Sequence, residues 1–160
     1  MKALTTHVQI FIYYNFKTSY NAALLFACYS KKMPMKILIV EDDDDILNLL
    51  KEVPEKEGFE VTGFNYTESI IKSMEKYKPE LNIPDFSLPG INGGELCHDI
   101  KCHPANASIP VIMLSAFPRV PESPGNYGSD AFLAKPFDTE YLLRTVYNCI
   151  DAKLAVLSGV

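Results

Sequence analysis

The sequence of 160 residues predicts an α/β fold with a doubly wound, five-stranded parallel sheet. From Met35 onwards, short apolar runs bounded by turn residues alternate with segments whose apolar residues recur at helical spacing. Such runs are typical of parallel strands, because helices cover both faces of the sheet. Regular alternation of strand and helix indicates crossover connections between parallel strands. The five predicted strands span residues 36–40, 59–63, 81–85, 110–114 and 131–134.

Helices are predicted between and after these strands. The acidic residues at 43–45 can cap the first helix, and Gly58 ends it. Its apolar residues at helical spacing are Ile46, Leu49, Leu50 and Val53. Thr67 is the predicted cap of the second helix, which stops before Pro79. The apolar residues of this helix that are expected to face the core are Ile70, Ile71, Met74 and Tyr77. A turn at 88–93 leads to a third helix over about 94–102, and the last helix covers Thr139–Leu154.

Polar residues stand at the ends of four of the predicted strands. Glu41 and Asp42 follow the first strand, and Asp85 closes the third. Ser115 and Lys135 follow the fourth and the fifth. Ligands of open α/β sheets bind beyond the carboxyl ends of the strands, so one edge would gather three acids, a hydroxyl and an ammonium group. This combination suits a divalent cation together with a phosphoryl group.

Four stretches carry a family resemblance: KILIVEDDDDIL (36–47), PDFSLPGINGGELC (84–97), PVIMLSAF (110–117) and SDAFLAKPFD (129–138). By their order and spacing, the chain from Met35 to about Ile150 resembles the receiver domain of two-component response regulators. The resemblance implies a flavodoxin-like receiver fold. It also implies a signalling domain rather than an ordinary enzyme, with at most self-catalysed phosphoryl transfer and dephosphorylation.

The resemblance assigns the metal and acceptor roles residue by residue. Asp85 matches the aspartate that becomes phosphorylated and that also faces Mg²⁺. Glu41 and Asp42 match the acidic pair, of which Asp42 would bind the ion directly and Glu41 partly through water. The backbone carbonyl of Ser87 would be a further protein ligand.

The remaining roles concern the phosphoryl oxygens and the switch. Lys135 matches the lysine that binds these oxygens, and Pro136 matches a proline that usually follows a cis peptide bond. Ser115 matches the switch hydroxyl that turns toward the phosphate. Phe132 stands at the position of the switch aromatic residue.

The function that follows from the resemblance is that of a stand-alone cytoplasmic receiver. It would accept a phosphoryl group from a sensor histidine kinase or a phosphotransfer protein and signal by binding a downstream protein. All 20 acidic residues and 11 of the 15 basic ones lie after residue 34, so this core has a net charge of −9. An acidic core argues against direct binding of nucleic acid. Four scattered cysteines indicate reduced thiols rather than a disulfide framework.

Residues 1–34 are predicted to be an extension outside the receiver of residues 35–160. The extension is basic, has no acidic residue, and its apolar stretches are too short to span a bilayer. Met35 begins MKILIVEDD, as many receivers begin. An over-extended start or a poorly ordered tail is therefore expected, with a targeting segment or a membrane-touching amphipathic tail as the alternatives.

The sequence departs from the family pattern at three places, of which the mildest is Pro54, which would shorten or kink the end of the first helix. Pro84 stands before Asp85, where leucine or a similar residue is usual, and it cannot donate to a sheet ladder. Asn82 adds to the same strand a polar group that needs a partner. The segment 117–130 has prolines at 118, 121 and 124, each costing about 3 kcal/mol in a helix interior. It is predicted as a loop, a polyproline-like strip or at most one helical turn in place of the fourth helix, which alters the usual output face.

Three other hypotheses are open at this point. A pseudo-receiver would keep the fold as an interaction module without regulation by phosphorylation. A haloacid dehalogenase-type phosphatase would use Asp43 and Asp45, although Leu47 does not fit that motif. A zinc site would need His98 and Cys102, which are four residues apart on one helix face, together with ligands that the sequence does not supply.

Overall fold

The computed structural model describes residues 34–116 and 127–158. In chain order the elements are β1 (Lys36–Val40), α3 (Asp44–Lys56), β2 (Glu60–Phe64), α4 (Ile70–Tyr77), β3 (Leu81–Pro84), β4 (Ser87–Leu88), β5 (Ile91–Asn92), α5 (Gly93–Cys102), β6 (Ile112–Ser115), β7 (Ala131–Ala134) and α6 (Thr139–Ser158). The predicted extension, residues 1–34, lies outside this part except for Pro34. Of the predicted loop at 117–130, residues 117–126 also lie outside it, and 127–130 form turns and bends.

The long strands are parallel, as predicted, but the ladder is not continuous. Strands β2, β1 and β3 form one parallel sheet in that order, and β6 pairs with β7 in a second. Two isolated parallel bridges join β3 to β6, between Asn82 and Val111 and between Asp85 and Leu114. The structure therefore shows a three-stranded and a two-stranded sheet in contact. The short hairpin of β4 and β5 was not among the predicted strands.

Pro84 explains the break between the two sheets. The Asn82 N–H donates to the Pro110 carbonyl at 3.0 Å, and the Phe86 N–H donates to the Leu114 carbonyl at 2.8 Å. Pro84 stands midway between these two donors and has no N–H of its own. One rung of the ladder is therefore missing, and only isolated bridges remain on either side of it.

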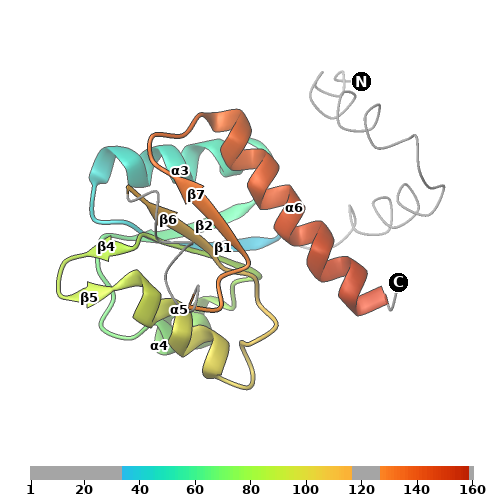
Figure 1. The fold of residues 1–160 in the computed structure, drawn as a ribbon. Helices are drawn as coiled ribbons and strands as arrows, with labels where there is room; N and C mark the ends of the chain where they lie inside the picture. The colour runs from blue at the N-terminus through green and yellow to red at the C-terminus, as the bar shows by residue number, and fades with distance from the viewer. Residues whose placement is uncertain (1–33, 117–126, 159–160) are drawn as a thin grey trace, which may run out of the picture. The chain divides into compact units, whose positions relative to one another are not determined.

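Helices cover both faces of the strands, with α3 and α6 on one face and α4 and α5 on the other (Figure 1). Residues of β1 alternate between the two layers, as side chains of a strand must. Ile37 and Ile39 pack with α3 and α6, whereas Leu38 and Val40 pack with α4 and α5. Each fully buried aliphatic side chain of this kind contributes roughly 1.5–3 kcal/mol. The carboxyl ends of the strands are thereby held between two apolar layers.

The helix starts are confirmed in one case and corrected in another. Asp43 caps α3, because its carboxylate accepts from the N–H groups of Asp45 and Ile46 at 2.9 and 3.0 Å. The cap of α4 is Ser69 rather than Thr67. Thr67 is buried instead, and its hydroxyl lies 3.2 Å from that of Ser73.

The inward face of α3 also differs from the prediction. Its buried residues are Leu47, Leu50 and Pro54, while Leu49 is 37% exposed. Five apolar residues occupy adjacent stripes of this helix, so periodicity alone does not decide which stripe meets the sheet. Within the part of the chain that the structure describes, no helix has the length and apolarity to cross a membrane.

Candidate functional site

The candidate site lies where β1, β3, β6 and β7 end. Glu41 follows β1, Asp85 follows β3, Ser115 ends β6, and Lys135 follows β7. The parallel registers bring these ends together: Val40 pairs with Pro84, and Ser115 pairs with Ala134. The bridge between Asp85 and Leu114 connects the two sheets at the same level. The four predicted polar positions are therefore brought to one edge.

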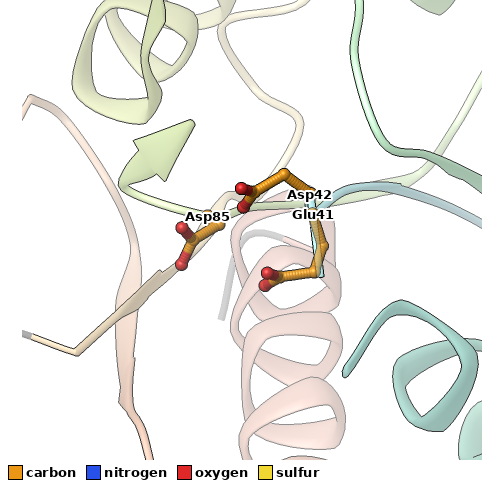
Figure 2. A group of neighbouring side chains, drawn as sticks. All are labelled: Glu41, Asp42 and Asp85. Atoms are coloured by element: carbon orange, nitrogen blue, oxygen red, sulfur yellow. The ribbon is translucent and has the colours of Figure 1, made fainter. Parts of the chain in front are cut away.

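Three carboxylates face one another at this edge. One oxygen each from Glu41, Asp42 and Asp85 can be chosen so that all three lie within 4.8 Å of one another. Figure 2 shows the three groups turned toward a common space. Glu41 and Asp85 are buried, whereas Asp42 is exposed. The cluster has the oxygen donors that Mg²⁺ prefers, and one of them is open to water, from which that ion takes its remaining ligands.

The ammonium group of Lys135 joins two of these carboxylates. Its Nζ lies 2.6 Å from Glu41 Oε2 and 2.8 Å from Asp85 Oδ1. The Lys135 side chain is only 16% exposed, so this charge has little contact with water. One buried ammonium partly neutralises two buried acids, and a cation at Asp42 would supply the balance.

The pKa values reflect this unequal sharing. Burial raises the pKa of Glu41, the hydrogen bond from Lys135 lowers it, and the nearby charge of Asp85 raises it again, with a net increase. Burial lowers the pKa of Lys135, but its hydrogen bonds and charge attraction to Asp85 and Glu41 outweigh burial, and its pKa rises. The Lys135 ammonium is attracted by two carboxylates, whereas Glu41 and Asp85 share that one ammonium between them. The site therefore favours a positive charge.

The raised pKa of Glu41 predicts a pH dependence of stability. A carboxyl group whose pKa is higher in the folded state stabilises the fold fully below its ordinary value of 4.5. That contribution is lost as the pH rises through the folded-state pKa. We expect the free energy of unfolding of the wild type, minus that of Glu41→Gln, to fall as the pH increases from about 4 to 7. Urea unfolding at a series of pH values measures this difference, and a difference that grows with pH would contradict the prediction.

The backbone after Asp85 fixes the second oxygen of its carboxylate. The Ser87 N–H donates to Asp85 Oδ2 at 2.9 Å. In the hairpin of β4 and β5, Gly93 N–H donates to the Phe86 carbonyl, so Ser87 takes the non-hydrogen-bonded place opposite Asn92. The N–H and carbonyl of a strand residue point to the same side. The Ser87 N–H, which is not used in the hairpin, is therefore free to bind the Asp85 carboxylate.

Gly93 is a residue to which the sequence assigned no role. A Cβ atom at this position would lie 2.0 Å from the carbonyl oxygen of Asp85 and 2.8 Å from Cα of Phe86. The first residue of α5 is therefore in direct contact with the backbone of Asp85 and Phe86. The pair Gly93-Gly94 was visible in the sequence, but the contact depends on the packing of α5 against β3.

The other predicted residues are placed as follows. Ser115 is buried at the end of β6, and Phe132 lies in β7 beside Met113, partly buried against the α4–α5 layer. The peptide bond between Lys135 and Pro136 is cis, as the resemblance implies. Of these residues, Ser115 is next to the bridge between Asp85 and Leu114, whereas Phe132 lies three residues before Lys135, within the strand.

Two alternative hypotheses do not fit these positions. Asp43, the nucleophile of the phosphatase hypothesis, is used as the cap of α3. Cys102 Sγ lies 3.5 Å from a ring nitrogen of His98, but the one group of three metal-binding side chains among the described residues is the acidic cluster. Burial raises the pKa of Cys97 to about 11, so it is a neutral core thiol. Packing and surface placement therefore account for these helix residues.

Comparison with known proteins agrees with this geometry. The family model of the response regulator receiver domain matches residues 37–147. The phosphate regulon transcriptional regulatory protein PhoB of Rhizobium meliloti (strain 1021) is 38% identical over 127 residues, which cover 77% of this chain and 56% of that protein. An uncharacterised 14.6 kDa protein of Leptolyngbya boryana is 32% identical over 114 residues, covering 70% of this chain and 87% of that protein.

A similar solved structure is that of the response regulator TrrA of Thermotoga maritima in complex with Mg(2+)-BeF. It has a TM-score of 0.65 and 27% sequence identity, and the match covers 72% of this chain and 98% of that chain. The chain spans about half the length of several curated relatives that it matches. Motifs, site geometry and family model agree over the same residues, and the chain belongs to the receiver domain family of two-component response regulators.

Proposed function

We propose that this protein is a magnesium-dependent phosphoacceptor in which Asp85 takes the phosphoryl group. The observation that carries the proposal is the contact of the Lys135 ammonium with both Asp85 and Glu41, beside a third carboxylate at Asp42. A phosphoryl group brought to Asp85 would meet this ammonium directly. The bridge between the two sheets also supports one five-stranded layer around the acceptor.

The residues that would hold Mg²⁺ are Glu41, Asp42 and Asp85 together with the Ser87 carbonyl. When bound, the ion supplies positive charge that offsets the repulsion between the acids and the incoming phosphoryl oxygens. Lys135 would hold one of these oxygens by a charge-assisted hydrogen bond, and Ser115 would hold another. The Ser87 N–H already fixes one carboxylate oxygen, which leaves the orientation of Asp85 defined before the donor arrives.

The reaction exchanges one bond to phosphorus for another. An Asp85 carboxylate oxygen forms the new bond, and the bond between phosphorus and the donor histidine nitrogen breaks. The electron pair of the broken bond stays on the imidazole nitrogen, and the donor leaves as neutral histidine. Hydrolysis later returns the carboxylate, with water supplying the oxygen that leaves on phosphate.

The donor would be a sensor histidine kinase or a phosphotransfer protein, and the signal would pass to a downstream protein. The acidic balance of residues 35–160 opposes direct binding of nucleic acid. A cytoplasmic location is part of this proposal, because the kinase would transfer the phosphoryl group in that compartment. The predicted loop at 117–130 would give this receiver an output surface of its own.

The test is phosphoryl uptake from acetyl phosphate, followed by intact mass, with Mg²⁺ present and after chelation. We expect one added phosphoryl group with Mg²⁺ and none without it, because three carboxylates with one ammonium repel an anionic donor. Reduction of the acyl phosphate with borohydride and peptide mapping should locate the modification at Asp85. Absence of any adduct, or an adduct on another residue, would contradict the proposal and favour the pseudo-receiver that Pro84 suggests.

A further inference from the structure

The contact between β3 and β6, here called the seam (residues 81–86 against 110–115), lacks one of its hydrogen bonds. Carbonyls along a parallel strand point alternately to either neighbour. The carbonyls of Pro110 and Leu114 face β3, and by this alternation the carbonyl of Ile112, the middle of the three, faces it too. The first and third accept from Asn82 and Phe86, at 3.0 and 2.8 Å. The middle one stands opposite Pro84, which has no hydrogen to donate.

The side chain of Asn82 is a second destabilising feature of β3. Asn82 is 1% exposed, and neither atom of its side-chain amide has a hydrogen-bond partner in the part of the chain described. Its neighbours in register are Leu38 and Val111, both apolar. A buried amide without partners favours any movement that lets it reach water or a carbonyl. Both weak points thus fall on the seam, whereas β1 pairs continuously with β2 and β3.

Charge connects the two sheets at the carboxyl end of the seam. Lys135, which follows β7, contacts Asp85 and Glu41 of the three-stranded sheet. Asp85 itself is bridged to Leu114, so Ser115 is the next residue along β6. A phosphoryl group on Asp85 would therefore add oxygen acceptors at the place where Lys135 and Ser115 bring donors from the two-stranded sheet.

We propose that the seam is a hinge, along which β6–β7 opens from β2–β1–β3, and that a phosphoryl group on Asp85 closes it. The hinge rests on the missing rung and the unpaired amide, which are properties of the unmodified chain. The closing step rests on the proposed function. Because Ser115 and Phe132 belong to the two-stranded sheet, closing the seam would move both residues together.

The hinge is tested by residue-resolved hydrogen exchange on the full chain without a phosphodonor. The amides of Asn82 and Phe86 cross the seam, while those of Glu41 and Asp85 bond to Phe64 and Val40 within the three-stranded sheet. We expect the first pair to exchange about tenfold faster, which corresponds to one missing hydrogen bond. Equal exchange of the two pairs would overturn the hinge.

Two variants separate the causes. Pro84→Leu restores an N–H opposite the Ile112 carbonyl, and Asn82→Leu removes the unpaired amide. Each should slow exchange across the seam, and Pro104→Leu, which removes an exposed proline from the loop after α5, should not. Seam exchange that is unchanged in both variants would overturn the assigned cause.

The closing step is tested with beryllofluoride and Mg²⁺, which mimic the phosphoryl group. Exchange at Phe86 should slow in the wild type and change less in Pro84→Leu, whose seam is already closed. If acetyl phosphate labels Asp85 but beryllofluoride leaves exchange at Phe86 unaltered, the closing step is wrong. If Asp85 is never labelled, the proposed function fails and the closing step with it, while fast seam exchange in the unmodified protein would still support the hinge.

Discussion

Replacing Asp85 with alanine is expected to abolish magnesium-dependent labelling by acetyl phosphate. Asp85 is the carboxylate that contacts the Lys135 ammonium at 2.8 Å while its other oxygen accepts the Ser87 N–H. Glu41 also contacts Lys135, but its second oxygen accepts from the Asp43 N–H at 3.3 Å and not from Ser87. No second acid among the described residues therefore combines both features of the acceptor.

The matched control is Asp99→Ala, which removes an exposed acid from α5 and should leave labelling at the wild-type level. Intact mass measured over a time course gives the extent of labelling for all three proteins. Asp85→Asn serves as a second variant, because it keeps the shape of the side chain if alanine disturbs the fold. Substantial labelling of either Asp85 variant would mean that another residue accepts the phosphoryl group.

Gly93→Ala is expected to have the largest effect of any single methyl group added near the site. The new Cβ would lie 2.0 Å from the Asp85 carbonyl oxygen and 2.7 Å from its carbonyl carbon. These are backbone atoms, so they move only if β3 or α5 moves. We expect a loss of about 1–3 kcal/mol or more in the free energy of unfolding, as for other overpacked positions. Labelling should fall as well, because the displaced backbone carries Asp85, the proposed acceptor.

Gly63→Ala is the control for a collision that side chains can relieve. Its Cβ would lie 2.8 Å from Leu47 Cδ1 and 2.9 Å from Lys51 Cδ, both near the ends of flexible side chains. The expected loss is smaller than that of Gly93→Ala, because side chains can move without a shift of the strand or the helix. Urea unfolding and intact-mass labelling of both variants measure the contrast. A Gly93→Ala protein as stable and as readily labelled as the wild type would show that α5 can shift without cost.

The fold class and the gathering of the polar residues could be predicted because both follow from strand ends. Apolar runs locate the strands, and parallel strands end at one edge, so Glu41, Asp85 and Lys135 had to meet if the topology was right. The cap at Asp43 was also predictable, since it depends on the adjacent backbone alone. The position of a strand end and the identity of a helix cap depend on a few neighbouring residues, and these two kinds of feature were therefore predictable.

Other features depend on packing that the sequence does not express. Thr67 and Ser69 are both good caps, but Thr67 is buried with its hydroxyl beside that of Ser73, and Ser69 caps α4. Leu47 rather than Leu49 is buried because the sheet meets only one stripe of a wide apolar face. The missing hydrogen bond at Pro84 was predictable from the sequence. Its effect on the site was not, because the carboxylate of Asp85 keeps its contact with Lys135 in spite of the interrupted ladder.

The alternation of side chains along β1 also bears on how the chain folds. Ile37 and Ile39 serve one apolar layer and Leu38 and Val40 the other, so neither layer is complete before β1 is in place. Its partners β2 and β3 are distant along the chain, and closing such long loops before their contacts form slows folding. Completion of both apolar layers therefore depends on the non-local pairing of β1 with β2 and β3.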